Sequence, residues 1–136
     1  MMPKQAPKQI VMQWLAAYNS HNATEAAALY ADDVVNTQMP WSKTVHGREA
    51  MHGTYVKIFQ AFPDIKVEIE NLLVIGDWVV VEWRFGGTMR GEFAGRAPSG
   101  RSFDIKGCEV FQITDGKIST QHGYWDKATM FGQLGI

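Results

Sequence analysis

The spacing of apolar residues predicts helices in the first part of the chain. Between Ile10 and Tyr18 an apolar side chain recurs every three or four positions, which is typical of an amphipathic helix that ends near Ser20. A second helix is expected directly afterwards, because Asn22 can cap it and Glu25 can reach back from its first turn. We therefore expect two helices to open the fold.

A short strand and a third helix are expected next. The segment from Val34 to Met39 reads as the strand. After Gly47 the sequence REAMHGTYVKIFQAF predicts a helix, which Pro63 ends. Its apolar stripe consists of Met51, Tyr55, Phe59 and Phe62.

The remainder of the chain has the two-residue alternation of β-strands. Strands are predicted over residues 65–70, 78–85, 102–113 and 118–126. Tight turns at Gly76-Asp77 and Asp115-Gly116 separate neighbouring strands, and a short helix over residues 127–135 follows the last one. Helices first and an antiparallel meander second indicate one α+β domain over residues 1–136, with the helices covering one face of a curved antiparallel sheet.

Aromatic residues and methionine are unusually frequent. The chain contains seven Phe, five Trp, four Tyr and seven Met. This mixture suits the wall of a pocket for a flat or apolar ligand, and the alternative is a well-filled core. The candidate substrate-binding residues are Trp14, Met39, Trp41, Met51, Tyr55, Phe59, Trp83 and Phe111.

Charge and cysteine content exclude several classes of partner. A net charge of −1 gives no basic field for nucleic acid or an anionic membrane surface, so neither is expected as a partner. The single cysteine, Cys108, excludes an internal disulfide and favours a cytoplasmic protein. His46 and His52 have no third ligand at a suitable spacing, so no metal is expected.

Ionisable side chains gather near the end of the last predicted strand. If Asp115-Gly116 forms a two-residue turn, Glu109 pairs with His122 across the two strands. One sheet face would then carry Glu109, His122, Tyr124 and Asp126. A three-residue loop with a glycine bulge would instead turn Glu109 toward Gln121 and Gly123.

A carboxyl group in such a cluster can move protons near neutrality. Burial among aromatic rings disfavours the charged form and raises the pKa of a carboxyl group. Asp126 also precedes the last predicted helix, where its side chain can accept backbone N–H bonds as a cap. The capping role and the catalytic role of Asp126 are both open at this point.

Several segments resemble one protein family. The stretches GTMRGEFAGRAPSGRSF, FQITDGKI and FGQLG, with ALYADDVV and HGREAM, resemble the SnoaL-like polyketide cyclase (ester cyclase) family of the NTF2-like superfamily, from about Ile10 to Gly135. The resemblance implies helices and a curved antiparallel sheet that form a cone around an apolar cavity, usually in a dimer or tetramer. It also implies ring closure by intramolecular aldol chemistry without a cofactor, in which an aspartate acts as acid and base and a histidine on the neighbouring strand assists.

The two residues that carry this chemistry differ here. The resemblance places the family's aspartate at Gly123 and its histidine at Glu109, so the usual pair is absent. Glu109, His122 and Asp126 remain nearby as an alternative acid and base set.

A second resemblance is less consistent with the residues present. The segment YADDVVNTQMP resembles ketosteroid isomerase, whose base would fall on Gln38 and whose oxyanion-hole tyrosine would fall on Trp14. An amide is not a base at neutral pH, so steroid isomerisation is disfavoured.

Our first hypothesis is a cofactor-independent enzyme that acts on a small hydrophobic carbonyl compound by proton abstraction next to the carbonyl. Asp126 would be the base or acid, Glu109 and His122 would relay or tune it, and Tyr124 would donate to the developing enolate.

Two other hypotheses involve no catalysis. The missing family pair favours a binding protein for a small hydrophobic molecule. A dimerising scaffold would pair through the outer sheet face, where Trp125 and Gln121 are expected. In each case we expect a homodimer, with a tetramer as the alternative.

Overall fold

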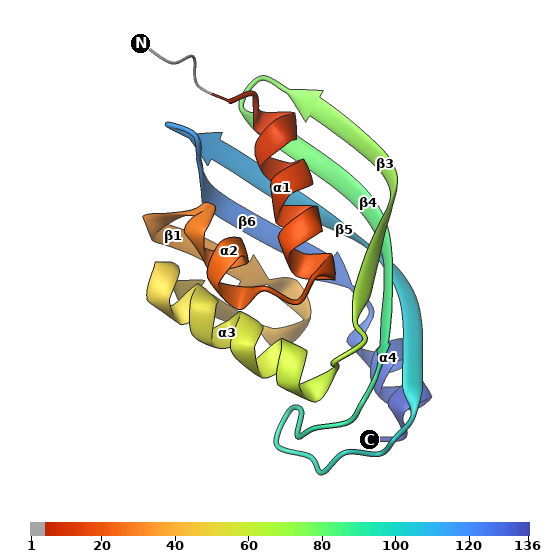
Figure 1. Ribbon diagram of the computed structural model, residues 1–136. Helices are drawn as coiled ribbons and strands as arrows, with labels where there is room; N and C mark the ends of the chain where they lie inside the picture. The colour runs from red at the N-terminus through yellow and green to blue at the C-terminus, as the bar shows by residue number, and fades with distance from the viewer. Residues whose placement is uncertain (1–4) are drawn as a thin grey trace.

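Helices pack on one face of a curved sheet in the computed structural model, which describes residues 5–136 (Figure 1). The helices are α1 (Pro7–Asn19), α2 (Ala23–Ala28), α3 (Arg48–Ala61) and α4 (Lys127–Leu134), with a single 3-10 turn, η1 (Met39–Trp41). The strands are β1 (Tyr30–Gln38), β2 (Lys43–His46), β3 (Lys66–Ile75), β4 (Trp78–Thr88), β5 (Ser102–Thr114) and β6 (Lys117–Trp125).

The predicted helices are confirmed, and local chemistry explains their ends. Pro7 begins α1, where its missing N–H costs nothing. Asn22 Oδ1 accepts the Glu25 backbone N–H at 3.0 Å and caps α2. This helix ends at Ala28 because β1 already begins at Tyr30. Within residues 5–136, none of these helices has the length and apolar composition needed to span a bilayer.

The sheet is mixed, so the prediction of an entirely antiparallel sheet is wrong. Its strands follow the order β2-β1-β6-β5-β4-β3, and β1 runs parallel to β6. The chain leaves β1 through β2 and α3, forms three further strands, and only then returns along β1 as β6. The small edge strand β2 was not predicted.

The turn between β5 and β6 has the predicted two residues, with Thr114 opposite Lys117. A bulge then follows, because Ile113 pairs with Ile118 whereas Gln112 pairs with Thr120. The predicted pairing of Glu109 with His122 is therefore wrong, and Glu109 lies opposite Gly123. The structure thus has the alternative register, in which Glu109 faces Gly123. The cause is a bulge within β6, whereas the prediction had assumed a longer turn.

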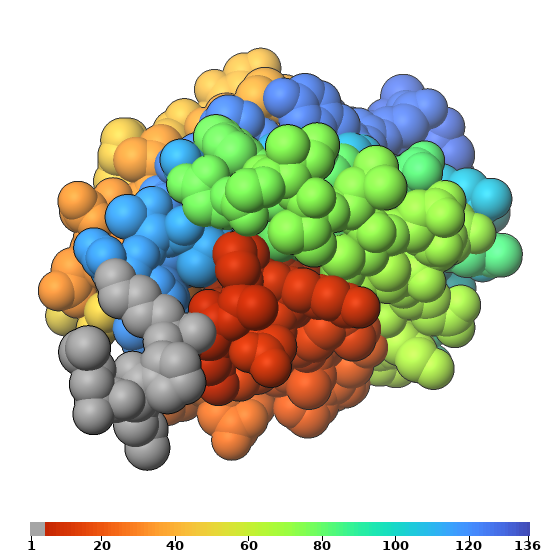
Figure 2. All heavy atoms as spheres, turned by 90° about the horizontal axis from the view of Figure 1, so that it is seen from above, coloured from red at the N-terminus to blue at the C-terminus, as the bar shows by residue number. Residues whose placement is uncertain are grey.

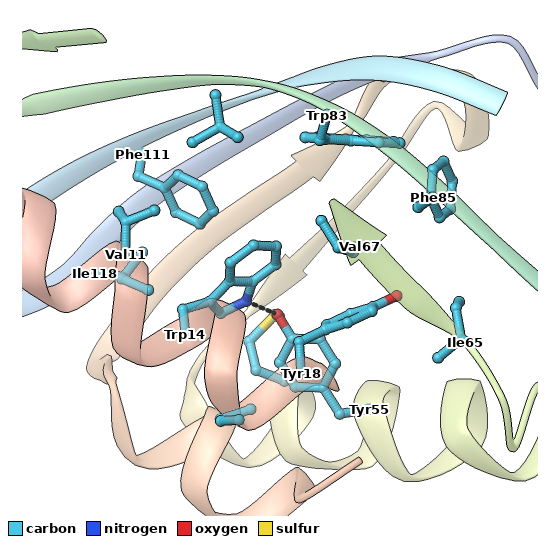
Figure 3. Close-up of a cluster of buried hydrophobic side chains, with 14 of the residues drawn as sticks. Val11, Trp14, Tyr18, Tyr55, Ile65, Val67, Trp83, Phe85, Phe111 and Ile118 are labelled. Carbon is cyan, nitrogen blue, oxygen red and sulfur yellow. Dashed lines mark hydrogen bonds between the residues drawn. The ribbon is translucent and has the colours of Figure 1, made fainter. Parts of the chain in front are cut away.

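Side chains fill the space between the helices and the inner face of the sheet. Trp14 and Tyr18 of α1 and Tyr55 of α3 lie against sheet residues such as Trp83 and Phe111 (Figure 3). Seen from above, the atoms of α1 and β3 meet without a hollow between them (Figure 2). The core is therefore continuous from the helices to the sheet.

The expected apolar cavity is not among the best-defined hollows of the described residues. The two best-defined hollows have volumes of about 360 and 390 Å³. Charged side chains of the outer face line them, including Arg84, Asp104 and Lys106. Neither hollow reaches Glu109, and because Glu109 is buried, a ligand in contact with it would have to displace side chains.

Two glycine substitutions test the packing. A Cβ at Gly107 would lie 2.8 Å from the Trp83 ring and 2.7 Å from the Tyr124 carbonyl oxygen, whereas a Cβ at Gly53 of α3 meets nothing within 4 Å. We expect Gly107→Ala to lower the free energy of unfolding by about 1–3 kcal/mol. Gly53→Ala should raise it by about 0.5–1 kcal/mol through helix propensity. Urea unfolding measures both, and equal effects would contradict the packing described.

Candidate functional site

Glu109 is the one charged side chain among the buried residues of the range 5–136, with 4% of its surface exposed. It lies on the inner face of β5, where Phe111 and Ile105 are its apolar neighbours on the same face. A carboxyl group in such a place must be hydrogen-bonded or neutral, because burying an unpaired charge costs on the order of several kcal/mol. Its partners therefore define the site.

Two side-chain amides donate to the same oxygen of Glu109. Gln38 Nε2 lies 2.6 Å from Glu109 Oε1, and Gln121 Nε2 lies 2.7 Å from it. Gln38 ends β1 and Gln121 lies on β6, so three strands meet at this carboxyl. Because Oε1 already accepts two N–H bonds, Oε2 carries the proton when Glu109 is neutral.

The Gln121 amide is the end of a chain of buried donors. Trp14 Nε1 donates to the Tyr55 hydroxyl at 2.9 Å (Figure 3). The Tyr55 and Tyr30 hydroxyls are hydrogen-bonded, and Tyr30 donates to Gln121 Oε1 at 2.5 Å. Because Tyr30 donates its one hydrogen to Gln121 Oε1, Tyr55 donates to Tyr30, and each member of the chain donates to the next one toward Glu109.

The Gln38 amide is the end of a second chain. Trp125 Nε1 donates to Gln38 Oε1 at 3.0 Å, and this contact fixes which end of the amide is oxygen. Gln38 Nε2 donates to Asn36 Oδ1 at 2.9 Å as well as to Glu109. Both chains begin at an indole and converge on one carboxyl oxygen.

The Trp83 indole N–H is buried beside Glu109 without a hydrogen-bond partner in the described part of the chain. It is near enough to lower the pKa of Glu109, although its geometry falls short of a hydrogen bond. A buried donor of this kind is rare in folded proteins and calls for an explanation. It offers one free donor next to a carboxyl group.

Burial raises the pKa of Glu109 from its usual 4.5 to about 7. The hydrogen bonds from Gln38 and Gln121 and the nearby Trp83 lower it again and keep it within the neutral range. The titratable groups that interact with Glu109 are Tyr18, Tyr30, Tyr55 and Cys108. Burial raises the pKa of each of them, so they stay neutral where Glu109 titrates.

The other predicted catalytic residues do not join Glu109. His122 pairs with Val110 and Tyr124 with Cys108, on the opposite face of the sheet. Asp126 is exposed and caps α4, where its carboxylate accepts the Thr129 backbone N–H at 3.0 Å and hydroxyl at 2.7 Å. These hydrogen bonds lower the pKa of Asp126, so the expected rise in carboxyl pKa occurs at Glu109 and not at Asp126. The four residues therefore form no single cluster.

The predicted substrate-binding residues divide into two groups. The first lies around the Glu109 network and consists of Trp14, Met51, Tyr55, Phe59, Trp83 and Phe111. Trp41 instead joins a ring cluster with Phe93, Trp125 and Phe131, at centroid distances of 5.7, 5.4 and 5.8 Å. Met39 is 40% exposed beside it. Phe131 of α4 and Phe93 of the loop between β4 and β5 are also in ring contact, so the ring cluster joins these two segments.

The prediction overlooked four polar residues that hold the site. They are Tyr30, Asn36, Gln38 and Gln121. Alternation along β1 could have placed Asn36 and Gln38 on the inner face with Val34. Gln121 and Trp125 were expected on the outer face, which is wrong because the bulge turns Gln121 inward and Trp125 joins the ring cluster.

No group of three His, Cys, Asp or Glu side chains in residues 5–136 is placed to hold a metal ion.

Helices packed on a curved, unclosed mixed sheet give this α+β chain the fold of proteins described as ketosteroid isomerase-like and NTF2-like. The sequence description of SnoaL-like polyketide cyclases matches residues 8–134, and the chain belongs to that family. It is similar to IdmH from Streptomyces antibioticus, a proposed polyketide cyclase, with 26% identity and a TM-score of 0.79 over 97% of this chain and 100% of that one.

Two further structures show how widely the fold is used. A protein with a ketosteroid isomerase-like fold from Catenulispora acidiphila, solved with trimethylamine, has 22% identity and a TM-score of 0.83, over 97% of this chain and 95% of that one. An LEH-like epoxide hydrolase from M. tuberculosis has 19% identity and a TM-score of 0.77, over 94% and 88%. At these identities the likeness shows the fold alone.

The pH dependence of stability tests the environment of Glu109. The folded state holds this proton more tightly than the unfolded chain, so the free energy of unfolding should fall as pH rises from 4.5 to 7. The loss attributable to Glu109 is at most about 3 kcal/mol. Glu109→Gln should lack this component in urea unfolding at a series of pH values. Parallel curves for the two proteins would show that Glu109 titrates normally.

Proposed function

We propose that this protein is a cofactor-independent enzyme that moves a proton on a small hydrophobic carbonyl compound, in a reaction of the cyclase or aldol type. The observation that carries the proposal is Glu109, the one buried carboxyl group of residues 5–136, whose pKa of about 7 suits proton transfer near neutrality. Membership of the SnoaL-like family supports it, because the family's description names polyketide cyclases.

In the proposed reaction, Glu109 carboxylate removes a proton from the carbon next to a substrate carbonyl. The C–H electron pair forms the enolate double bond and the carbonyl pair moves to oxygen. The enolate carbon then attacks a second carbonyl of the same molecule, and the proton held on Glu109 passes to the new alkoxide. Removal and return of one proton balance the sequence without a co-reactant.

The Trp83 indole N–H is the proposed donor to the enolate oxygen. It is buried, has no partner in the described structure and lies beside Glu109. A donor aimed at the oxygen where charge develops stabilises the transition state more than the ground state. This role would also explain why the protein keeps a buried N–H without a partner.

The closed interior sets a condition on the proposal. Because Glu109 is buried, a substrate must displace side chains to reach it. We propose that the ring cluster of Trp41, Phe93, Trp125 and Phe131 is the part displaced, since Trp125 directly contacts the Gln38 amide.

A binding protein without catalysis is the second candidate. The observation in its favour is Gly123, which stands where the family resemblance places an aspartate. In that case Glu109 would only orient a ligand, and its replacement would change affinity without changing any rate.

Proton exchange provides a test that does not require the natural substrate. Deuterium incorporation next to the carbonyl of small aromatic and alicyclic ketones in D₂O can be followed by NMR. We expect Glu109→Gln to lower the rate by at least about 100-fold and Trp83→Phe by about 10-fold or more. Asp126→Asn is the matched control and should leave the rate within about twofold. Equal rates for wild type and Glu109→Gln would contradict the proposal.

The homodimer stays a prediction, and the outer sheet face is where we propose a second copy packs. Leu73, Ile75 and Tyr124 are 56%, 66% and 46% exposed there. Leu73→Glu should shift sedimentation toward the monomer, because association would bury the new charge. Met12→Glu is the control: Met12 lies on α1, is 42% exposed, and its substitution should leave the sedimentation unchanged. A monomeric wild type would contradict the prediction.

A further inference from the structure

Gln38 and Gly123 form a close pair across the parallel strands. They are directly opposite each other in the β1–β6 register. A Cβ built on Gly123 would overlap the carbonyl oxygen, the carbon and the nitrogen of the Gln38 amide. The amide thus lies against Gly123, in space that the Cβ of any other residue would occupy. Backbone conformation does not require this glycine, because Gly123 is absent from the residues with positive φ.

Every hydrogen-bonding group of the Gln38 amide is used. Its oxygen accepts the Trp125 indole N–H, and its two N–H groups donate to Asn36 and Glu109. Because the indole cannot accept a hydrogen bond, the amide cannot be turned end for end without losing this contact. Gln38 is thus held in one orientation before it contacts the carboxyl group.

We infer that Gln38 is a positioning residue of the Glu109 site, and that residue 123 is glycine because the Gln38 amide needs its space. The amide holds Oε1, so that Oε2 is the oxygen left to exchange a proton. That this positioning serves catalysis rests on the proposed function. The contacts of Gln38 with Gly123 and Glu109 do not depend on it.

The same amide connects the carboxyl group to the ring cluster. Trp125 stacks edge-on against Trp41 at 5.4 Å and donates to Gln38 through its indole. A ligand that moves Trp125 would release the Gln38 oxygen and loosen the hold on Glu109. Entry of a ligand and the protonation of Glu109 are coupled through this one side chain.

Four variants test the inference in the free protein: Gln38→Ala, Gly123→Ala, the double variant and Gln38→Met. The titration midpoint of the Glu109 side-chain carboxyl carbon is measured by ¹³C NMR, together with the indole N–H signal of Trp125. Loss of one amide donor should raise the midpoint by about one pH unit, since the carboxylate is the form that it stabilises. Tyr18, Tyr30, Tyr55 and Cys108, the titratable groups near Glu109, remain neutral in this range.

Gly123→Ala should act like Gln38→Ala, because its methyl group expels the amide. Both single variants should raise the midpoint and move the Trp125 signal, and the double variant should show no further rise. Gly123→Ala should also lower stability in the wild type but not in the Gln38→Ala background. Gln38→Met, which keeps the length of the side chain, gives the midpoint if the alanine variants fold poorly.

Additive effects, or an unchanged midpoint in Gly123→Ala or Gln38→Met, would overturn the inference. Gly132→Ala, whose added Cβ meets nothing within 4 Å, is the control for a glycine substitution and should leave the midpoint unchanged. None of these measurements needs a substrate. A raised midpoint in a protein that shows no proton exchange would thus reject the proposed function and leave the inference standing.

Discussion

The site depends on the burial of one carboxyl group in an aromatic core. Moving a carboxylate out of water is so unfavourable that Glu109 must either be neutral or be held by hydrogen-bond donors. Here the free energies of its neutral and ionised forms are close to each other near pH 7. Two amides stabilise the charged form and the surrounding rings disfavour it. The balance between them gives a group that exchanges protons near neutrality.

The topology of the sheet supplies both amides. Gln38 reaches the site because β1 lies beside β6 and runs parallel to it. β6 carries Gln121, the other hydrogen-bond partner of Glu109. Gln121 reaches it because the bulge in β6 changes which side chains face inward. Without the bulge, His122 would lie opposite Glu109 in place of Gly123, and Gln121 would face outward. The identity of the site is thus decided by one extra residue in a strand.

Local signals in the sequence were sufficient for the elements and for much of the core. Spacing of apolar residues predicted the helices, and turn residues predicted both tight hairpins. Pairing between distant segments leaves no such signal, so neither the parallel β1–β6 pair nor the role of Gln38 could be predicted. Ile118 and Gln121 are both buried although they are three positions apart, whereas regular alternation would place them on opposite faces. This spacing is the only sign of the bulge in the sequence of β6.

The central claim is that Glu109 is protonated and ionised in comparable amounts near pH 7. Isotope-edited infrared spectroscopy measures this directly, by comparing wild-type protein labelled with ¹³C at glutamate side chains with the labelled Glu109→Gln variant. The account predicts one protonated carboxyl band that is present at pH 6, is absent from the variant, and falls to about half of its intensity near pH 7. Loss of that band below pH 5 would contradict it, because Glu109 would then be an ordinary, well-solvated carboxylate.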